Sequence, residues 1–138
     1  RVSLIEGINK NLIDVIVSDH KPEDEESKRL TFSQAATGAS GIETFLSLAL
    51  EQFHNGSIKL DKIIELITHN PAKILKINKG NLSVGVNADF CIVDISKPWI
   101  VKKENLVSKS KNTSIEGRKL QGKVLSTFVK GQELYKTK

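Results

Sequence analysis

The sequence has no methionine, one cysteine, one tryptophan and one tyrosine among its 138 residues. Because Cys91 is the single thiol, no internal disulfide can form, and we expect a reducing, cytoplasmic setting in which Cys91 is a small core residue. No apolar run approaches the roughly 18 residues of a membrane span, so we expect no membrane partner. The sequence opens on Arg1 without a signal peptide, and we expect it to be a segment of something longer.

Hydrophobic residues make up only 38% of the chain and aromatic residues only 5%. These fractions are low for a chain that encloses its own core, so we expect the protein to pack against another surface that helps to cover it. Residues 97–138 hold 11 of the 21 Lys and Arg but only three of the 16 Asp and Glu. The lysines are scattered and no nucleic-acid motif accompanies them, so this end is predicted to be a solvated basic face that binds no nucleic acid.

Leu12–Val17 is a nearly continuous apolar stretch that ends in Ser18-Asp19-His20. Continuous rather than alternating hydrophobicity is typical of a parallel strand covered on both faces. Residues 21–29 are predicted to form a loop, because Pro22 and a cluster of like charges disfavour regular structure. Side chains at the carboxyl ends of barrel strands line an active site, so Asp19 is a candidate catalytic acid; a helix cap or a turn former is the alternative.

Helical periodicity dominates residues before Gly80, and short strands with tight turns are predicted after it. We therefore place a domain boundary near residue 79, giving segments 1–79 and 80–138. The predicted helices cover residues 2–8, a stretch from Gly41 to a stop at Asn55-Gly56, residues 60–68, and a short helix capped by Asn70 before Pro71. The predicted strands cover residues 81–85, 89–94, 124–130 and 131–135.

Several motifs occur in order along the chain: Asp19-His20-x-Pro22, Lys28-Arg29-Leu30-x-Phe32 and Gly38-Ala39-x-Gly41-x-Glu43-Thr44, followed by HNPAKIL (69–75), GNLSVGVNADFCIVD (80–94), SKSKNT (108–113) and LQGKVLSTFVKGQELY (120–135). Together they resemble the dihydroorotase family of the cyclic amidohydrolase superfamily. The resemblance implies an α/β fold: the C-terminal part of a (β/α)8 amidohydrolase barrel in residues 1–79, with the last strand and its helices, and the C-terminal strands of a small β-sandwich domain in residues 80–138.

The family hydrolyses the cyclic amide of dihydroorotate reversibly in pyrimidine biosynthesis, with zinc activating a water molecule. By resemblance, Asp19 touches the metal and carries the proton of the attacking water. Thr37 and Gly38 correspond to a loop that holds substrate through backbone groups. Glu23 stands where many members have a substrate-contacting histidine, and a carboxylate there would repel an acidic substrate.

The family's other zinc ligands belong to earlier strands, and the three histidines here do not replace them. His20 follows Asp19, while His54 is predicted to be a surface residue and His69 a structural one. We therefore expect no zinc on this chain alone, although the complete family enzyme uses it. A partner chain carrying the N-terminal strands, or self-association, is predicted to cover Leu12–Val17.

Three functions fit this pattern. The chain is the C-terminal part of a dihydroorotase, inactive until it joins its N-terminal part. It is alternatively a catalytically silent remnant, or a scaffold subunit for a transcarbamoylase.

Overall fold

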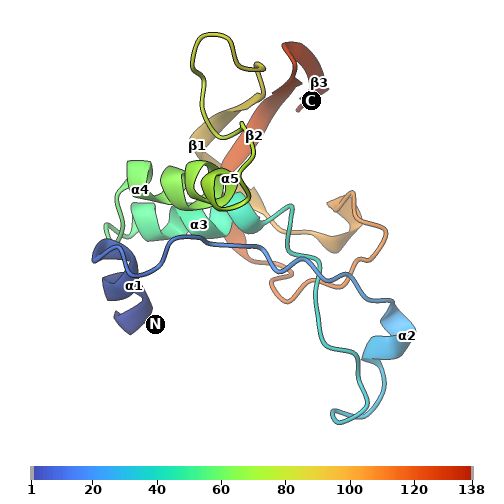
Figure 1. The fold of residues 1–138 in the computed structure, drawn as a ribbon. Helices are drawn as coiled ribbons and strands as arrows, with labels where there is room; N and C mark the ends of the chain where they lie inside the picture. The colour runs from blue at the N-terminus through green and yellow to red at the C-terminus, as the bar shows by residue number, and fades with distance from the viewer. Residues whose placement is uncertain (1, 138) are drawn as a thin grey trace.

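The computed structural model describes residues 2–137, with helices in the first part of the chain and strands in the last (Figure 1). The helices are α1 (Val2–Asn9), α2 (Glu25–Lys28), α3 (Phe45–His54), α4 (Leu60–Ile64), the π-helix η1 (Glu65–His69), α5 (Asn70–Ile74) and the 3-10 helix η2 (Lys103–Asn105). The strands are β1 (Phe90–Ile100), β2 (Lys119–Val129) and β3 (Gln132–Lys136).

The three strands form one antiparallel sheet in the order β1-β2-β3. Phe90 pairs with Phe128 across β1 and β2, and their rings stack with centroids 4.6 Å apart. Lys130 and Gly131 connect β2 to β3, and both have positive φ, 51° and 80°. Positive φ at both central residues is the geometry of a tight hairpin turn. The turn predicted between residues 124–130 and 131–135 is therefore confirmed.

Helix α3 packs on the sheet at Gly122 of β2 (Figure 1). Ser47 Oγ donates a hydrogen bond of 2.6 Å to the Gly122 carbonyl, and Trp99 Nε1 donates one of 3.1 Å to the same oxygen. A Cβ atom on Gly122 would lie 2.4 Å from Leu50 Cδ1, and its φ is +95°. Only glycine lets the helix approach this closely while the strand keeps that backbone conformation.

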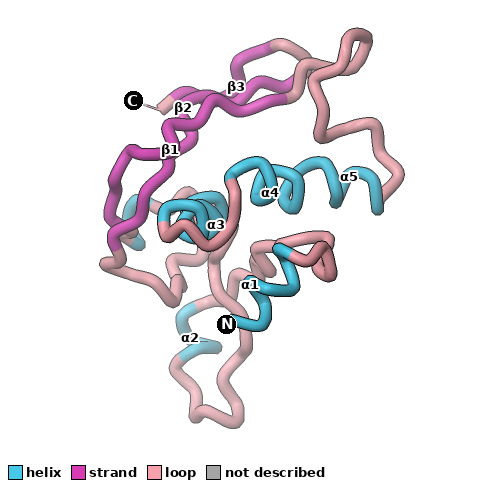
Figure 2. The backbone as a smooth tube through the Cα atoms, turned by 90° about the vertical axis from the view of Figure 1, so that its left-hand side faces the viewer, coloured by secondary structure: helices cyan, strands magenta, loops and turns pink. Residues whose placement is uncertain are grey.

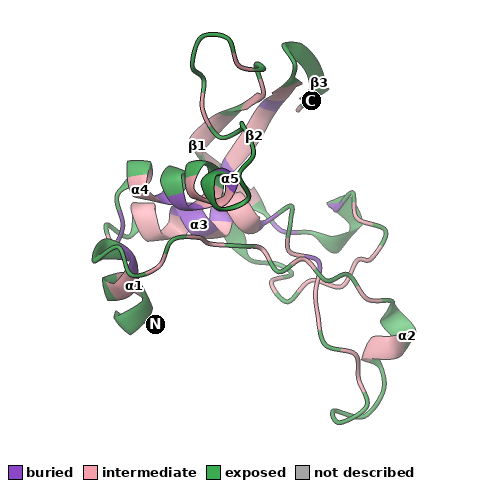
Figure 3. Ribbon diagram, in the orientation of Figure 1, coloured by how far each residue is buried: buried purple, intermediate pink, exposed green. Residues whose placement is uncertain are grey.

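The buried core lies between α1, α3 and the α4–η1 helix, and Figure 3 shows how little of the chain it occupies. Its buried members are Ile8, Ala49, Ile58, Ile63 and Leu66. Figure 2 shows three layers in order, with the sheet outermost, then α3, α4 and α5, and then α1. The segment predicted to be the last barrel strand contributes Ile13 and Ile16 to the rim of this core.

Residues 12–17 do not form a strand, so that prediction is wrong for this chain by itself. A strand needs a neighbouring strand to exchange hydrogen bonds with, and the described residues offer none beside this segment. The Ile16 amide instead donates to the Leu66 carbonyl at 3.1 Å, and Asn70 Nδ2 donates to the Asp14 carbonyl at 2.9 Å. Leu12 and Val17 remain 75% and 71% exposed.

Four smaller predictions also need correction. Residues 21–29 include the helix α2, because the Asp24 carboxylate accepts the Ser27 amide at 2.8 Å and caps it. Asn70 lies inside a continuous helical run, and its side chain does not cap the beginning of α5. Residues 81–85 form no strand. Cys91 is exposed, because its end of the sheet projects beyond the helices (Figure 1).

Candidate functional site

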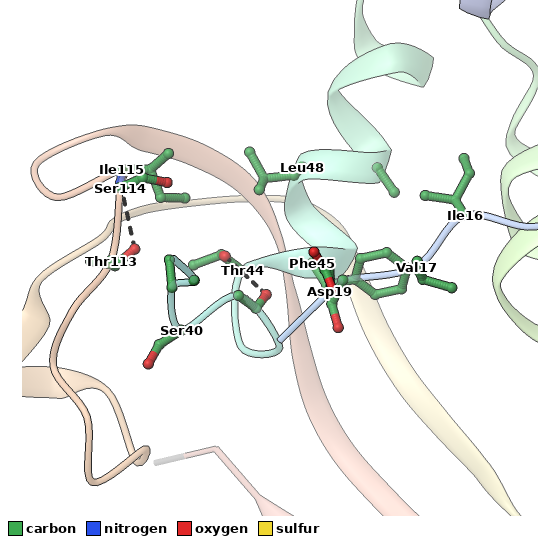
Figure 4. A pocket seen from close by; sticks show the side chains of 15 residues that line it. Ile16, Val17, Asp19, Ser40, Thr44, Phe45, Leu48, Thr113, Ser114 and Ile115 are labelled. Carbon is green, nitrogen blue, oxygen red and sulfur yellow. Dashed lines mark hydrogen bonds between the residues drawn. The ribbon is translucent and has the colours of Figure 1, made fainter. Parts of the chain in front are cut away.

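A pocket of about 480 Å³ lies where three distant parts of the chain meet (Figure 4). The first part is residues 16–19, at the end of the apolar segment. The second is the loop 38–41 with the beginning of α3, and the third is residues 113–115. The predicted barrel half and the predicted β-domain half therefore both contribute to the walls.

Asp19 lies in the pocket wall near Phe45, at the beginning of α3 (Figure 4). Its backbone has φ +44°, a left-handed conformation that few residues other than glycine adopt and that Asp tolerates better than most. The side chain is exposed and accepts no hydrogen bond from residues 2–137. A carboxylate held in an unusual backbone conformation, without a protein partner, is open to a ligand or a reacting group.

His20 points its Nδ1 atom toward the loop that precedes α3. Nδ1 accepts hydrogen bonds from the Gly41 amide at 3.1 Å and the Ile42 amide at 3.3 Å. An imidazole nitrogen that accepts two N–H groups carries no proton, so Nδ1 is the bare nitrogen of the ring. His20 thereby links the segment that carries Asp19 to the opposite wall of the pocket.

Gly38 lines the pocket, and its conformation is fixed from several sides. Its φ is +128°, and a Cβ atom would lie 2.5 Å from the Lys21 carbonyl oxygen. Its own carbonyl accepts from Lys28 Nζ at 2.9 Å and from Asn112 Nδ2 at 3.1 Å. The neighbouring Thr37 is exposed, lies outside the pocket lining, and accepts from Lys21 Nζ at 3.4 Å.

Glu23 also lies outside the pocket lining, so the structure separates it from Asp19 and Gly38. Its carboxylate pairs with Lys21 Nζ at 3.5 Å. The lysine partly offsets the negative charge of the Glu23 carboxylate.

The sequence does not single out the residues that join the two halves of the site. The Glu43 carboxylate accepts the Val107 amide at 2.8 Å and the Ser108 amide at 2.9 Å. The Ser40 amide donates to the Asn112 carbonyl at 2.7 Å. Glu43 and Asn112 belong to the motifs that carry the family resemblance, and that membership is the one signal that could have marked them.

Within residues 2–137, no group of three or more His, Cys, Asp and Glu side chains is placed to hold a metal ion. Of these residue types, only Asp19 lines the pocket in the described part of the chain. His54 is exposed, as predicted, and its Nε2 lies 3.0 Å from the Ile95 carbonyl, while His69 is exposed in η1. The donor set therefore does not fit a zinc site, which takes three or four protein ligands. No helix in the described part of the chain is long and apolar enough to cross a membrane.

Comparisons with known proteins agree with this architecture. The profile of the Amidohydrolase family matches residues 1–134. The dihydroorotase of Wolbachia sp. subsp. Drosophila simulans (strain wRi) is 39% identical over 138 residues, which are 100% of this chain and 31% of that protein. The dihydroorotase of Aquifex aeolicus (strain VF5) is 41% identical over 136 residues, or 99% of this chain and 32% of that protein. The resemblance to dihydroorotases is thus confirmed.

Solved structures give the same result for the fold. The L-hydantoinase (dihydropyrimidinase) from Arthrobacter aurescens superposes with a TM-score of 0.88 at 31% identity, over 98% of this chain and 31% of that chain. The dihydropyrimidinase from Brevibacillus agri NCHU1002 superposes with a TM-score of 0.91 at 22% identity, over the same shares, and supports the fold alone. The chain spans about 31% of the length of the proteins it matches. With its α/β architecture and a family match over residues 1–134, the chain belongs to the amidohydrolase family.

Proposed function

We propose that this chain supplies one wall of a dihydroorotase-like active site and contributes Asp19 to the reversible hydrolysis of the cyclic amide of dihydroorotate. The observation that carries the proposal is the Asp19 carboxylate, which lines a pocket without a protein partner and lies at a left-handed φ of +44°. Similarity to dihydroorotases over the whole chain supports the substrate class.

Asp19 acts as a proton carrier in this reaction. Water attacks the ring carbonyl carbon, so a carbon–oxygen bond forms and the carbon–nitrogen bond of the cyclic amide breaks. The Asp19 carboxylate accepts the proton that the water loses and delivers it to the departing nitrogen. The reverse reaction closes the ring through the same two transfers. By the family resemblance, Gly38 and Thr37 hold the substrate through backbone groups; Gly38 lines the pocket, and Thr37 precedes it in the chain.

The family resemblance implies zinc in the complete enzyme, where the ion would polarise the carbonyl and activate the water. Among residues 2–137, Asp19 is the one candidate ligand in the pocket lining. We therefore propose that the other ligands lie outside the chain, and that the isolated chain binds no stoichiometric zinc. Elemental analysis of the purified chain after dialysis checks this, and one zinc per chain would contradict it.

The remaining wall is assigned to an N-terminal dihydroorotase part, with self-association as the second possibility. In this arrangement residues 1–79 complete a barrel and residues 80–138 complete a small β-domain. The exposed side chains of Leu12 and Val17 support the assignment, because large apolar side chains left open at both ends of one apolar segment are typical of a surface that a neighbour covers. A cytoplasmic location stays a prediction from the single cysteine.

The test is dihydroorotase turnover by the chain joined to its N-terminal part, comparing Asp19→Asn with the matched control Asp14→Asn from the same exposed segment. Loss of the proton carrier should lower kcat by about 10²- to 10⁴-fold in Asp19→Asn and leave the control unchanged. Full turnover in Asp19→Asn would disprove the assigned role. A wild-type assembly that copurifies with a transcarbamoylase and turns over no substrate would favour the scaffold alternative.

A further inference from the structure

The histidine beside the candidate acid has a contact pattern that sets it apart from the other two histidines. His20 is half-buried, and its Nδ1 accepts two main-chain amides from residues more than 20 positions away along the chain. His54 contacts a single carbonyl, and His69 contacts none of the described polar groups. His20 is therefore tied to a loop, whereas the others lie on the surface.

Gly41 and Ile42 end the loop that begins at Gly38, and they lead directly into the turn before α3. The other end of the loop is fastened to the same side, because the Lys21 amide donates to the Ala39 carbonyl at 3.1 Å. Two attachments from adjacent residues, His20 and Lys21, thus fix the separation between Asp19 and Gly38. Without the His20 contacts, the amides of Gly41 and Ile42 have no described partner to replace Nδ1.

We propose that His20 is a positioning residue, whose unprotonated Nδ1 fastens the loop 38–42 to the segment that carries Asp19. It touches neither substrate nor reacting atoms, and acts by holding the two walls of the pocket in register. The inference deepens the proposed function, and it depends on that function only where turnover is measured.

The role of His20 Nδ1 as a hydrogen-bond acceptor can be tested separately from the bulk of the imidazole ring. In His20→Asn, the side-chain oxygen takes the place of Nδ1 as an acceptor, whereas His20→Leu keeps comparable bulk and offers none. The matched control is His69→Leu, which removes an exposed histidine from a helix. Hydrogen exchange of the Gly41 and Ile42 amides in the full 138-residue chain reports the contact directly.

Exchange at these two amides should be about tenfold faster in His20→Leu, and within about twofold of wild type in His20→Asn and His69→Leu. Unchanged exchange in His20→Leu would overturn the proposal, and so would His20→Asn exchanging as fast as His20→Leu. If His20→Leu does not fold, the ¹⁵N resonances of wild-type His20 decide: a bare Nδ1 with a protonated Nε2 supports the proposal, and a proton on Nδ1 overturns it.

Turnover by the joined enzyme gives the second readout. His20→Leu should lower kcat, because both pocket walls still form but no acceptor at residue 20 aligns them. His20→Asn keeps the acceptor and should therefore keep kcat near the wild-type value. Wild-type kcat in His20→Leu would overturn the positioning role. Absence of turnover in the wild-type assembly would count against the proposed function, while the exchange measurement would still decide the contact of His20.

Discussion

At Gly38, the backbone conformation and the close packing each require glycine. The φ of +128° disfavours any side chain, and the Lys21 carbonyl oxygen occupies the space in which a Cβ atom would lie. The carbonyl of Gly38 is also held by Lys28 and Asn112. The loop is therefore rigid at the point where it faces Asp19.

Gly38→Ala tests both requirements for glycine, with Gly85→Ala as the matched control. Gly85 has φ +91°, and a Cβ atom there would meet open space, so alanine introduces backbone strain without a clash. We expect Gly85→Ala to lower the free energy of unfolding by about 1 kcal/mol. The added clash should make Gly38→Ala worse by at least about 2 kcal/mol, measured by urea unfolding. Equal losses would show that the loop yields freely at residue 38.

Asp89 is the second residue whose surroundings make a measurable prediction. The Lys79 ammonium beside it and the Lys130 amide, which donates at 2.7 Å, hold the pKa of the Asp89 carboxyl below its usual 3.8. A lowered pKa contributes stability that is present above 3.8 and is lost as the pH falls through the lowered value. Lys79→Gln should raise the pKa of Asp89 toward 3.8, as followed by NMR titration of its side-chain carbon. An unchanged pKa would assign the shift to the Lys130 amide alone.

At the residue scale, a site residue could be predicted from the sequence where its immediate sequence context marked it. Asp19 follows an apolar run, and Gly38 lies in a recognisable motif, so both could be named. Lys28, Glu43 and Asn112 could not be assigned roles, because their partners lie 10, 64 and 74 positions away, respectively, and only folding brings them together. Cys91 is exposed rather than buried, because the apolar run around it lies on a part of the sheet that none of the described helices covers (Figure 1).

At the scale of elements, the helical run α4–η1–α5 explains how the segment before Asp19 is held. In η1 the Asn70 amide bonds to the Glu65 carbonyl, five residues back rather than four. The Leu66 carbonyl would next be reached by residue 71, but proline has no N–H. That carbonyl is therefore free to accept the Ile16 amide at 3.1 Å.

Pro71→Ala tests this account, with Lys73→Ala as a control at an exposed position of the same helix. The new amide at residue 71 competes with Ile16 for the Leu66 carbonyl. Exchange of the Ile16 amide should therefore become about three- to tenfold faster, although alanine favours the helix itself. An Ile16 amide that exchanges at the wild-type rate would mean that the π-turn does not control this contact.

The sequence predicted α1, α3 and the β2–β3 hairpin because each depends on local periodicity or turn chemistry. It could not predict the π-turn, since Asn70-Pro71 has the pattern of an ordinary helix start. It predicted a strand at Leu12–Val17 from hydrophobicity alone, but a strand also requires neighbours. Burial on two faces and hydrogen bonding to two neighbours are separate conditions, and only the first is encoded in the segment itself.

At the scale of the whole molecule, large apolar side chains remain exposed that the chain does not cover by itself. Leu12 and Val17 lie on the segment that leads to Asp19, while Ile13 and Ile16 between them pack on the core. The segment thus has one face turned inward and another that is open. An assembly that covers the open face would remove this apolar surface from water, which supplies a favourable free energy for association.

Val17→Lys tests whether that face is where the proposed N-terminal part binds. A lysine buried at a contact without a partner is costly, so the affinity between the two parts should fall by about a hundredfold, measured by isothermal titration calorimetry. Val84→Lys is the matched control, because Val84 is fully exposed and lies outside the lining of the Asp19 pocket. It should bind as wild type does. Wild-type affinity in Val17→Lys would place the contact elsewhere, and the Asp19 pocket would then need a different second wall.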